Sequence, residues 1–193
     1  EKYDQHKVAL ATARAGNVIG GGDWAPDRLV PDTMRALLAD QAISVRYPHA
    51  TRPWQHVLEP LSGYLALAQS LIQNPGKAHG ESFNFGPGGE QNYSVARIIE
   101  DLSSQWEFRN PADAFRVTGE ASFAESNLLK LNCDKSLHHL KWLPTLSYSR
   151  MIELVGSWYY RYYKKTGPMY EFTLDQISKY EAEAAQRGLQ WTH

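Results

Sequence analysis

The sequence predicts an α/β fold. Short apolar runs of strand length alternate with longer segments in which apolar residues recur at helical spacing. Clusters of Gly, Pro, Asn and Asp separate these segments, as they do between the elements of a folded domain. A chain of 193 residues removes roughly 70% of its unfolded surface from water. A core of this size needs neither metals nor disulfides.

The first element is an apolar run, Val8 to Ala13, which predicts a buried strand. A buried strand needs neighbours on both faces and residue 1 is Glu, so we expect a fragment whose sheet has strands upstream; a swapped or edge position of this strand is the alternative. We also expect the exposed flank of this strand to be prone to association. A Gly- and Asp-rich loop follows from Gly16 to Asp27. Val30 to Asp40 then has helical spacing, with Pro31 in the first turn.

The next elements repeat this alternation. Strands are predicted at Ile43 to Val45 and at Trp54 to Val57, with the polar loop Pro48 to Arg52 between them. A helix is predicted from Glu59 to Gln73. The tripeptide Asn74-Pro75-Gly76 stops it.

The second half continues in the same way. Ser82 to Phe85 predicts a strand that ends in a glycine-rich turn, and Ser94 is expected to cap the following helix. The remaining predicted elements are one strand and three helices: Phe115 to Thr118, Asp134 to Leu140, Ser149 to Lys165, and Leu174 to Arg187, the last of them exposed and charged.

An aromatic stripe marks the third of these helices, at Trp158, Tyr159, Tyr162 and Tyr163. Core and interface packing is the more frequent use of such a stripe, while a sugar-stacking platform stays open.

The charge balance excludes several classes of protein. Twenty Lys plus Arg against twenty-one Asp plus Glu give a net charge of −1, without the basic excess of a nucleic-acid binder. No segment reaches the roughly 20 apolar residues of a membrane helix, and the first residues do not form a signal peptide. Cys133 is the single cysteine. A reducing, cytoplasmic compartment is therefore expected.

Two motif matches are interpreted as accidental, and a third as part of a packing face. Gly20 to Ala25 satisfies the dinucleotide fingerprint GxGxxG/A, but Pro26 and Asp27 leave no room for a helix directly behind it. Tyr3 and Lys7 match the YxxxK pair of short-chain dehydrogenases, yet a strand rather than a helix follows. Tyr160 and Lys164 do lie on a predicted helix, where an amphipathic packing face is the more frequent meaning. No catalytic residue is assigned.

Polar residues at element boundaries are the candidate binding groups. Asn17 follows the first strand at its carboxyl end, where open α/β sheets bind ligands. Arg28 and Arg52 each stand at a boundary between a loop and an element, where a fixed guanidinium binds phosphate in bidentate fashion. A turn asparagine and two surface ion pairs are the alternatives that the residues leave open.

Two further polar residues lie on predicted strands. His56 shares a face with Trp54 and is predicted to be a core histidine, because no other metal-binding side chain falls at ligand spacing. Asn84 lies between Phe83 and Phe85 and therefore points to the opposite face. It is either a contact to a base or ribose or an edge asparagine.

Several strings together resemble the CDP-glucose 4,6-dehydratase family of extended short-chain dehydrogenases/reductases. They are ATARAGNVIGGGDWAPDRLVPD from Ala11, RPWQHVLEPLSGYLALAQ from Arg52, FNFGPG from Phe83, LKLNCDKS from Leu129, KWLP from Lys141 and YEFTLDQISKYE from Tyr170. The resemblance implies the C-terminal, substrate-binding part of an NAD(P)-binding Rossmann-like fold, without its N-terminal Rossmann portion. It implies a substrate-binding domain at residues 1–170, with the last strands of the Rossmann-type sheet, and a helical tail at 171–193.

The same resemblance implies a role for individual residues. Asn17 would contact the diphosphate or hexose of the substrate, and Arg28 and Arg52 would hold the diphosphate. Leu29 would pack against the nucleotide. The remaining implied contacts are Arg46 and Asn84 at the cytidine pocket and the backbone of Ala15 near the nicotinamide.

The implied activity is the NAD-dependent conversion of CDP-glucose into CDP-4-dehydro-6-deoxyglucose and water, in deoxysugar or glycan biosynthesis. In such enzymes a hydride leaves C4, water is lost across C5 and C6, and the hydride returns to C6. The chain alone is expected to be inactive, and the full-length enzyme is expected to form a homo-oligomer. Another nucleotide-sugar epimerase or decarboxylase, or a binding module for a glycan or protein, stays open as an alternative.

Overall fold

The computed structural model describes residues 8–106, 110–118 and 130–192. The strands in this part of the chain are β1 (Thr12–Ala15), β2 (Asn17–Ile19), β3 (Ile43–Val45), β4 (Thr51–Arg52), β5 (Trp54–His56), β6 (Ser82–Phe85), β7 (Tyr93–Ser94) and β8 (Phe115–Val117). The helices are α2 (Leu29–Leu38), α3 (Leu58–Gln73), α4 (Pro75–Ala78), α5 (Val95–Gln105), α6 (Asp134–Leu140), α7 (Tyr148–Lys164) and α8 (Met169–Gln186), with 3₁₀ turns at Pro111–Asp113 and Gln190–Thr192.

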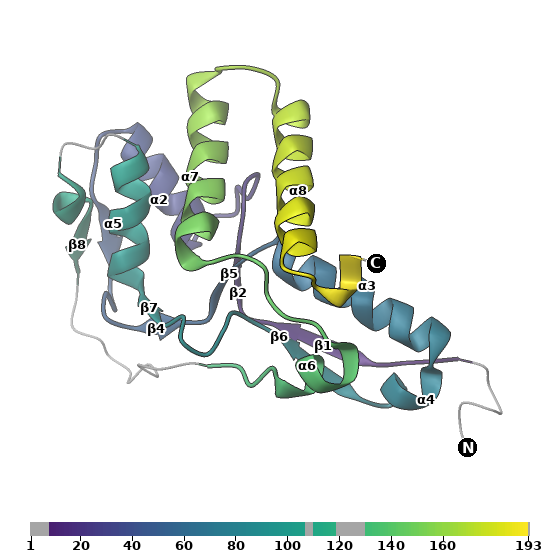
Figure 1. Cartoon of the computed structure of the whole chain (residues 1–193). Coiled ribbons are helices and arrows are strands. Elements are labelled where there is room, and N and C mark those ends of the chain that lie inside the picture. The colour runs from purple at the N-terminus through teal and green to yellow at the C-terminus, as the bar shows by residue number, and fades with distance from the viewer. Residues whose placement is uncertain (1–7, 107–109, 119–129, 193) are drawn as a thin grey trace.

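The strands pair two by two. β1 runs parallel to β6, β2 to β5 and β3 to β8, while β4 and β7 form a short antiparallel pair. Helices cover these pairs in two groups: α2, α5 and α7 gather on one side, and α3, α4 and α6 surround β1 and β6 (Figure 1). The predicted α/β class is confirmed.

The larger core fills the space between α2, α5 and α7. Ile98, Ile99 and Leu102 of α5 are fully buried there, at the helical spacing that the sequence predicted for this face. Ser94 caps α5 as expected, because its hydroxyl accepts the Arg97 N–H at 3.2 Å. The apolar stripe of α2 packs on the same core through Met34, which has no exposed surface.

A buried carboxylate connects three distant segments beside the smaller cores. Glu59, in the first turn of α3, is only 2% exposed. It accepts the backbone N–H groups of Thr145 and Leu146 and the hydroxyl of Tyr180 on α8, with donor to oxygen distances of 2.6 to 3.0 Å. Burial raises the pKa of Glu59, and these hydrogen bonds oppose that shift. The carboxylate therefore holds α3, α8 and the segment before α7 together.

α8 begins earlier than predicted and is less exposed. It starts at Met169 rather than Leu174, and its stripe of Gln176, Tyr180 and Ala184 is buried while most of its other residues face solvent. Gln176 donates to the backbone oxygen of Leu154 on α7 at 2.9 Å. The proposed boundary between residues 170 and 171 falls inside this helix, and the division into two domains stays a prediction.

The burial predicted for the first strand is wrong. β1 starts at Thr12, and the apolar side chains of Val8 and Leu10 before it are 63% and 64% exposed. The reason is that β1 pairs only with β6 among the described residues, so its other edge is open. Part of the predicted loop at residues 16–27 is also wrong, because β2 occupies Asn17–Ile19.

Smaller differences concern the ends of elements. Residues 51 and 52 of the predicted polar loop form β4. The predicted stop after α3 is the single residue Asn74, and α4 begins directly after it. The aromatic helix α7 is capped by Ser147, whose hydroxyl accepts the Arg150 N–H, rather than opened by Ser149. No helix in the described ranges has both the length and the apolar character that crossing a membrane would need.

We predict that Glu59→Gln destabilises the chain. The amide keeps the volume of the side chain but offers one acceptor where two backbone N–H groups and a hydroxyl now converge, so a charged hydrogen bond is lost. Urea unfolding at pH 7 should show a loss of about 1.5 to 3 kcal/mol. The matched control Glu181→Gln, on the exposed side of α8, should stay within about 0.5 kcal/mol of wild type. Equal effects of the two changes would contradict a bracing role for Glu59.

His56 lies in the core, as expected. We predict that folding stability depends on this residue and falls in acid. The ring is 4% exposed, its Nδ1 accepts the Leu58 N–H at 3.3 Å, and burial lowers its pKa to about 4. Between pH 6.5 and 4 the unfolded chain binds a proton that the folded chain does not, so stability falls as pH falls. From pH 7 to pH 5 wild type should lose about 2 kcal/mol more than His56→Asn, measured by urea unfolding. The same loss in both proteins would refute this assignment.

Candidate functional site

The candidate site lies where one extended segment changes its strand partner. β1 pairs with β6 and β2 pairs with β5, and only Gly16 separates β1 from β2. The Gly16 N–H donates to Phe85, whereas the next N–H, that of Asn17, donates to Pro53. A Cβ on Gly16 would overlap the Pro53 carbonyl oxygen, so no other residue fits without movement. A change of partner at the carboxyl ends of parallel strands opens a crevice, and open α/β sheets bind ligands there.

A hollow of about 400 Å³ occupies this position. It brings together three of the predicted site residues: Asn17 at the start of β2, and Arg28 and Leu29 at the start of α2. The residues that line the hollow are Gly16, Asn17, Val18, Ile19, Gly20, Asp23, Asp27, Arg28, Leu29, Val30, Pro31 and Trp54.

The first turn of α2 forms part of the wall of this hollow. Arg28 is the N-cap residue, and its side chain accepts no hydrogen bond from the helix. The N–H groups of Leu29 and Val30 are therefore not capped by a side chain, and Pro31 has no N–H to satisfy. The positive end of the helix dipole lies at the same place and favours an anionic ligand, against the carboxylates of Asp23 and Asp27 in the same lining.

Arg28 is held over the hollow by an acidic residue of the preceding loop. Its Nη1 lies 3.3 Å from Oδ2 of Asp23, while Oδ1 of Asp23 accepts the Ala25 N–H at 3.0 Å. The Arg28 side chain is 66% exposed, and an exposed pair of this kind contributes about 0 to 1 kcal/mol. A phosphate that binds Arg28 in bidentate fashion can therefore replace Asp23.

Aromatic rings of α7 fix the loop that carries Asp23. The Trp158 ring fills the space that a side chain at Gly21 would need, so the loop lies directly against the helix. The Tyr159 hydroxyl donates to the backbone oxygen of Asp23 at 2.7 Å, and burial raises the pKa of Tyr159 to about 12. Trp24 completes the contact, with its ring centroid 4.7 Å from that of Tyr162.

This arrangement explains the glycine string in residues 20–22. Gly21 and Gly22 lie against Trp158 of α7 and Gly20 lies against Val57, and the chain continues as a loop until α2 begins at Leu29. The predicted absence of a helix directly behind the string is confirmed. The packing role predicted for the aromatic stripe of α7 is confirmed as well, since Trp158, Tyr159 and Tyr163 pack on the larger core. Tyr3 and Lys7 lie outside the described residues.

The other predicted site residues do not line this hollow. Arg52 on β4 donates through Nη1 to the Thr51 carbonyl oxygen at 2.8 Å, and Arg46 is exposed at the bend after β3. Asn84 on β6 donates to the Asn132 carbonyl oxygen at 2.9 Å, pointing away from the buried Phe83 and Phe85 as predicted. Ala15 ends β1, one residue before the change of strand partner.

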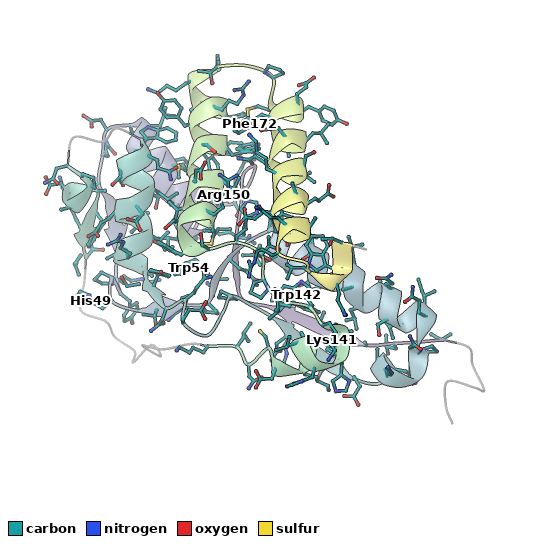
Figure 2. All side chains as sticks on the ribbon, viewed as in Figure 1. His49, Trp54, Lys141, Trp142, Arg150 and Phe172 are labelled. Carbon is teal, nitrogen blue, oxygen red and sulfur yellow. The ribbon has the colours of Figure 1, made fainter. Side chains whose placement is uncertain are left out.

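Two residues of the site were missed by sequence reasoning. Trp54 lines the hollow from β5, where its indole N–H donates to the Tyr93 backbone oxygen at 3.1 Å. Figure 2 shows Trp54 beneath the lower end of α7. Asp23 sets the position of Arg28. The signal in the sequence was a carboxylate, Asp23, five residues before Arg28 in one loop. Asp23 was overlooked because it lies within the string interpreted as an accidental fingerprint.

The sequence is similar to that of a characterised enzyme. Over 157 residues it is 41% identical to CDP-glucose 4,6-dehydratase of Salmonella typhimurium, and this match covers 81% of the chain and 43% of that protein. The chain is a relative of CDP-glucose 4,6-dehydratase. It spans less than half the length of this relative. No family model matches it.

Solved structures show the same fold at low identity. UDP-glucuronic acid 4-epimerase from Bacillus cereus, in complex with UDP-glucuronic acid and NAD, aligns with a TM-score of 0.67 at 18% identity over 83% of this chain and 48% of its own. dTDP-glucose 4,6-dehydratase from Bacillus anthracis, in complex with NAD, aligns with a TM-score of 0.64 at 14% identity. This alignment covers 85% of this chain and 48% of the dehydratase. The fold is therefore that of the extended short-chain dehydrogenases/reductases, as predicted.

We predict that Gly21→Ala disturbs the site from outside the hollow. The new methyl group would overlap the Trp158 ring, so either the loop or α7 must move. Unfolding should require about 1 to 3 kcal/mol less free energy. Gly76→Ala is the matched control, because nothing lies within 4 Å of a Cβ at that position. A Gly21→Ala protein as stable as this control would contradict the close contact.

Proposed function

We propose that this chain is the substrate-binding part of an NAD-dependent CDP-glucose 4,6-dehydratase. The proposal extends to the chain the activity named for its 41% identical relative. The fold of nucleotide-sugar dehydratases and epimerases supports the wider reaction class. The choice of cytidine over uridine or thymidine rests on the relative alone.

The observation that carries the proposal is the convergence of three kinds of donor on one hollow. Asn17 offers an amide, Arg28 a guanidinium, and the first turn of α2 two backbone N–H groups. A diphosphate needs charged and backbone donors of this kind, and a neutral hexose needs amide groups from loops. Leu29 and Trp54 add apolar surface on which a nucleotide or sugar packs.

The remaining assignments form part of the proposal. Arg52 would approach the diphosphate from β4, because the adjacent Pro53 carbonyl already binds the backbone of Asn17. Arg46 and Asn84 would border the cytosine.

The described residues fit NAD only at the edge of its site. Ala15 ends β1 next to the change of strand partner, where its backbone would lie near the nicotinamide. NAD, when bound, supplies the hydride acceptor of the reaction. Gly20 packs against Val57, which caps α3, and Gly21 and Gly22 pack against α7 rather than opening a helix, so we assign the pyrophosphate of NAD to none of the described residues.

Two further parts of the proposal concern the setting of the enzyme. We place it in a reducing cytoplasm, in agreement with its single cysteine, Cys133, which is free. The full-length enzyme would form a homo-oligomer.

We predict that the purified chain binds CDP more tightly than UDP or dTDP, measured by isothermal titration calorimetry. Arg28→Ala should weaken CDP binding by about 1.5 to 3 kcal/mol, the range of a charged hydrogen bond, and Arg52→Ala should act in the same direction. Arg97→Ala is the control, since Arg97 lies on α5 and pairs with Asp101 at 2.7 Å.

The outcomes separate the parts of this assignment. Tighter binding of UDP would favour an epimerase over the dehydratase. Binding that is unchanged by Arg28→Ala would remove the diphosphate from this hollow, and indifference to all three nucleotides would overturn the proposed substrate class.

A further inference from the structure

A second and larger hollow lies at the opposite end of the folded molecule from α2. Its volume is about 710 Å³, and its walls come from the end of α3, from α4, from the end of α6 and from the C-terminal 3₁₀ turn. Figure 1 shows α4 and α6 near the described N-terminal residues, far from α2, and Figure 2 shows Lys141 at the same end of the molecule. The hollow shares no residue with the proposed substrate site.

The lining of this hollow is cationic. Lys77 of α4 stands on one wall, and Lys141, His138 and His139 stand at the end of α6. None of the twelve described residues that line it is Asp or Glu. No carboxylate of the described residues forms an ion pair with Lys77 or Lys141, whereas the neighbouring Lys135 pairs with Glu81. Two lysines therefore line one cavity whose described walls hold no carboxylate.

Helix-end electrostatics explains only part of this pattern. The last turn of a helix favours positive side chains, which accounts for a cation at the end of α6. Lys77 also lies in the last turn of its helix, α4, so helix-end electrostatics accounts for each lysine separately but not for the fact that both helix ends line one hollow. Lys141 closes α6 in a left-handed backbone conformation, with φ of 54°, as Lys165 closes α7, so this conformation belongs to the helix end.

The rest of the lining suits a flat polar ring. Trp191 forms part of the wall, stacked on Tyr180 with a centroid distance of 5.5 Å, and its indole N–H has no acceptor among the described residues. Amide side chains, among them Gln73, offer donors and acceptors to ring edges. The volume exceeds what a bare phosphate needs and falls in the range of small-molecule sites.

We propose that this hollow binds a nucleoside monophosphate, with its phosphate between Lys77 and Lys141 and its base against Trp191. The site would be separate from the substrate hollow and independent of the proposed dehydratase activity. Occupancy would join α3, α4, α6 and the C-terminal turn, since each contributes to the wall.

The test is an NMR titration of the purified, isotope-labelled chain with AMP, adenosine and inorganic phosphate. AMP at millimolar concentration should shift the Trp191 indole N–H resonance, assigned with Trp191→Phe, and the imidazole resonances of His138 and His139. Adenosine and inorganic phosphate should each bind at least about tenfold more weakly than AMP. The double variant Lys77→Gln, Lys141→Asn should lower AMP affinity by about tenfold or more. Asn is chosen at 141 because it tolerates the left-handed conformation.

Arg28→Ala separates this site from the substrate hollow and should leave the AMP response unchanged. Both lysines are exposed, so the double variant should fold, which its far-UV circular dichroism will show. The proposal is overturned if AMP up to 10 mM, roughly the weakest affinity of interest for a metabolite site, shifts none of these resonances. It is also overturned if the double variant binds AMP like wild type, or if adenosine or inorganic phosphate binds as tightly as AMP.

Discussion

The candidate site depends on a single close approach, that of the Trp158 ring to the backbone of Gly21. Because the ring occupies the space of a missing side chain, the loop lies directly on α7. Tyr159 then fixes the backbone of Asp23, and the side chain of Asp23 pairs with the exposed Arg28. The carboxylate that pairs with Arg28 is therefore placed by a helix more than 130 residues further along the chain. A loop rich in glycine becomes a defined wall because a rigid helix supports it.

A second constraint acts at the start of α3. Glu59 satisfies two backbone N–H groups and a tyrosine hydroxyl inside the protein, where an unpaired donor would cost about 1 to 3 kcal/mol each. Arg187, at the end of α8, donates to the carbonyl oxygens of Pro144 and Thr145, so the same segment is held from both directions. Polar pairs rather than apolar contact alone thus fix α8 against α3.

Periodic patterns were predictable from the sequence, and contacts between distant segments were not. The face of α5 and its Ser94 cap follow from spacing that is local to the helix. β2 and β4 lie inside stretches whose Gly, Asp and other polar residues indicate loops, whereas β3, β5 and β8 are about as short and were predicted. The burial of the first strand could not be judged from its apolar residues, because burial depends on neighbours that a strand does not encode.

The same distinction applies to the candidate sites. Asn17, Arg28 and Leu29 were predictable because they follow a strand or begin a helix, and the fold brings such ends together. Asp23 required the knowledge that its loop folds back onto α7. The lysines and histidines of the larger hollow come from separate elements, so no spacing in the sequence could predict that they line one hollow.

Gly16 alone connects β1 to β2, which restricts how the sequence can change in length. Strand residues alternate between faces, so a deletion or insertion at this position would invert every following side chain of β2 and turn Asn17 out of the crevice. Length variation among homologues should therefore accumulate in loops such as residues 86–92 and spare this position.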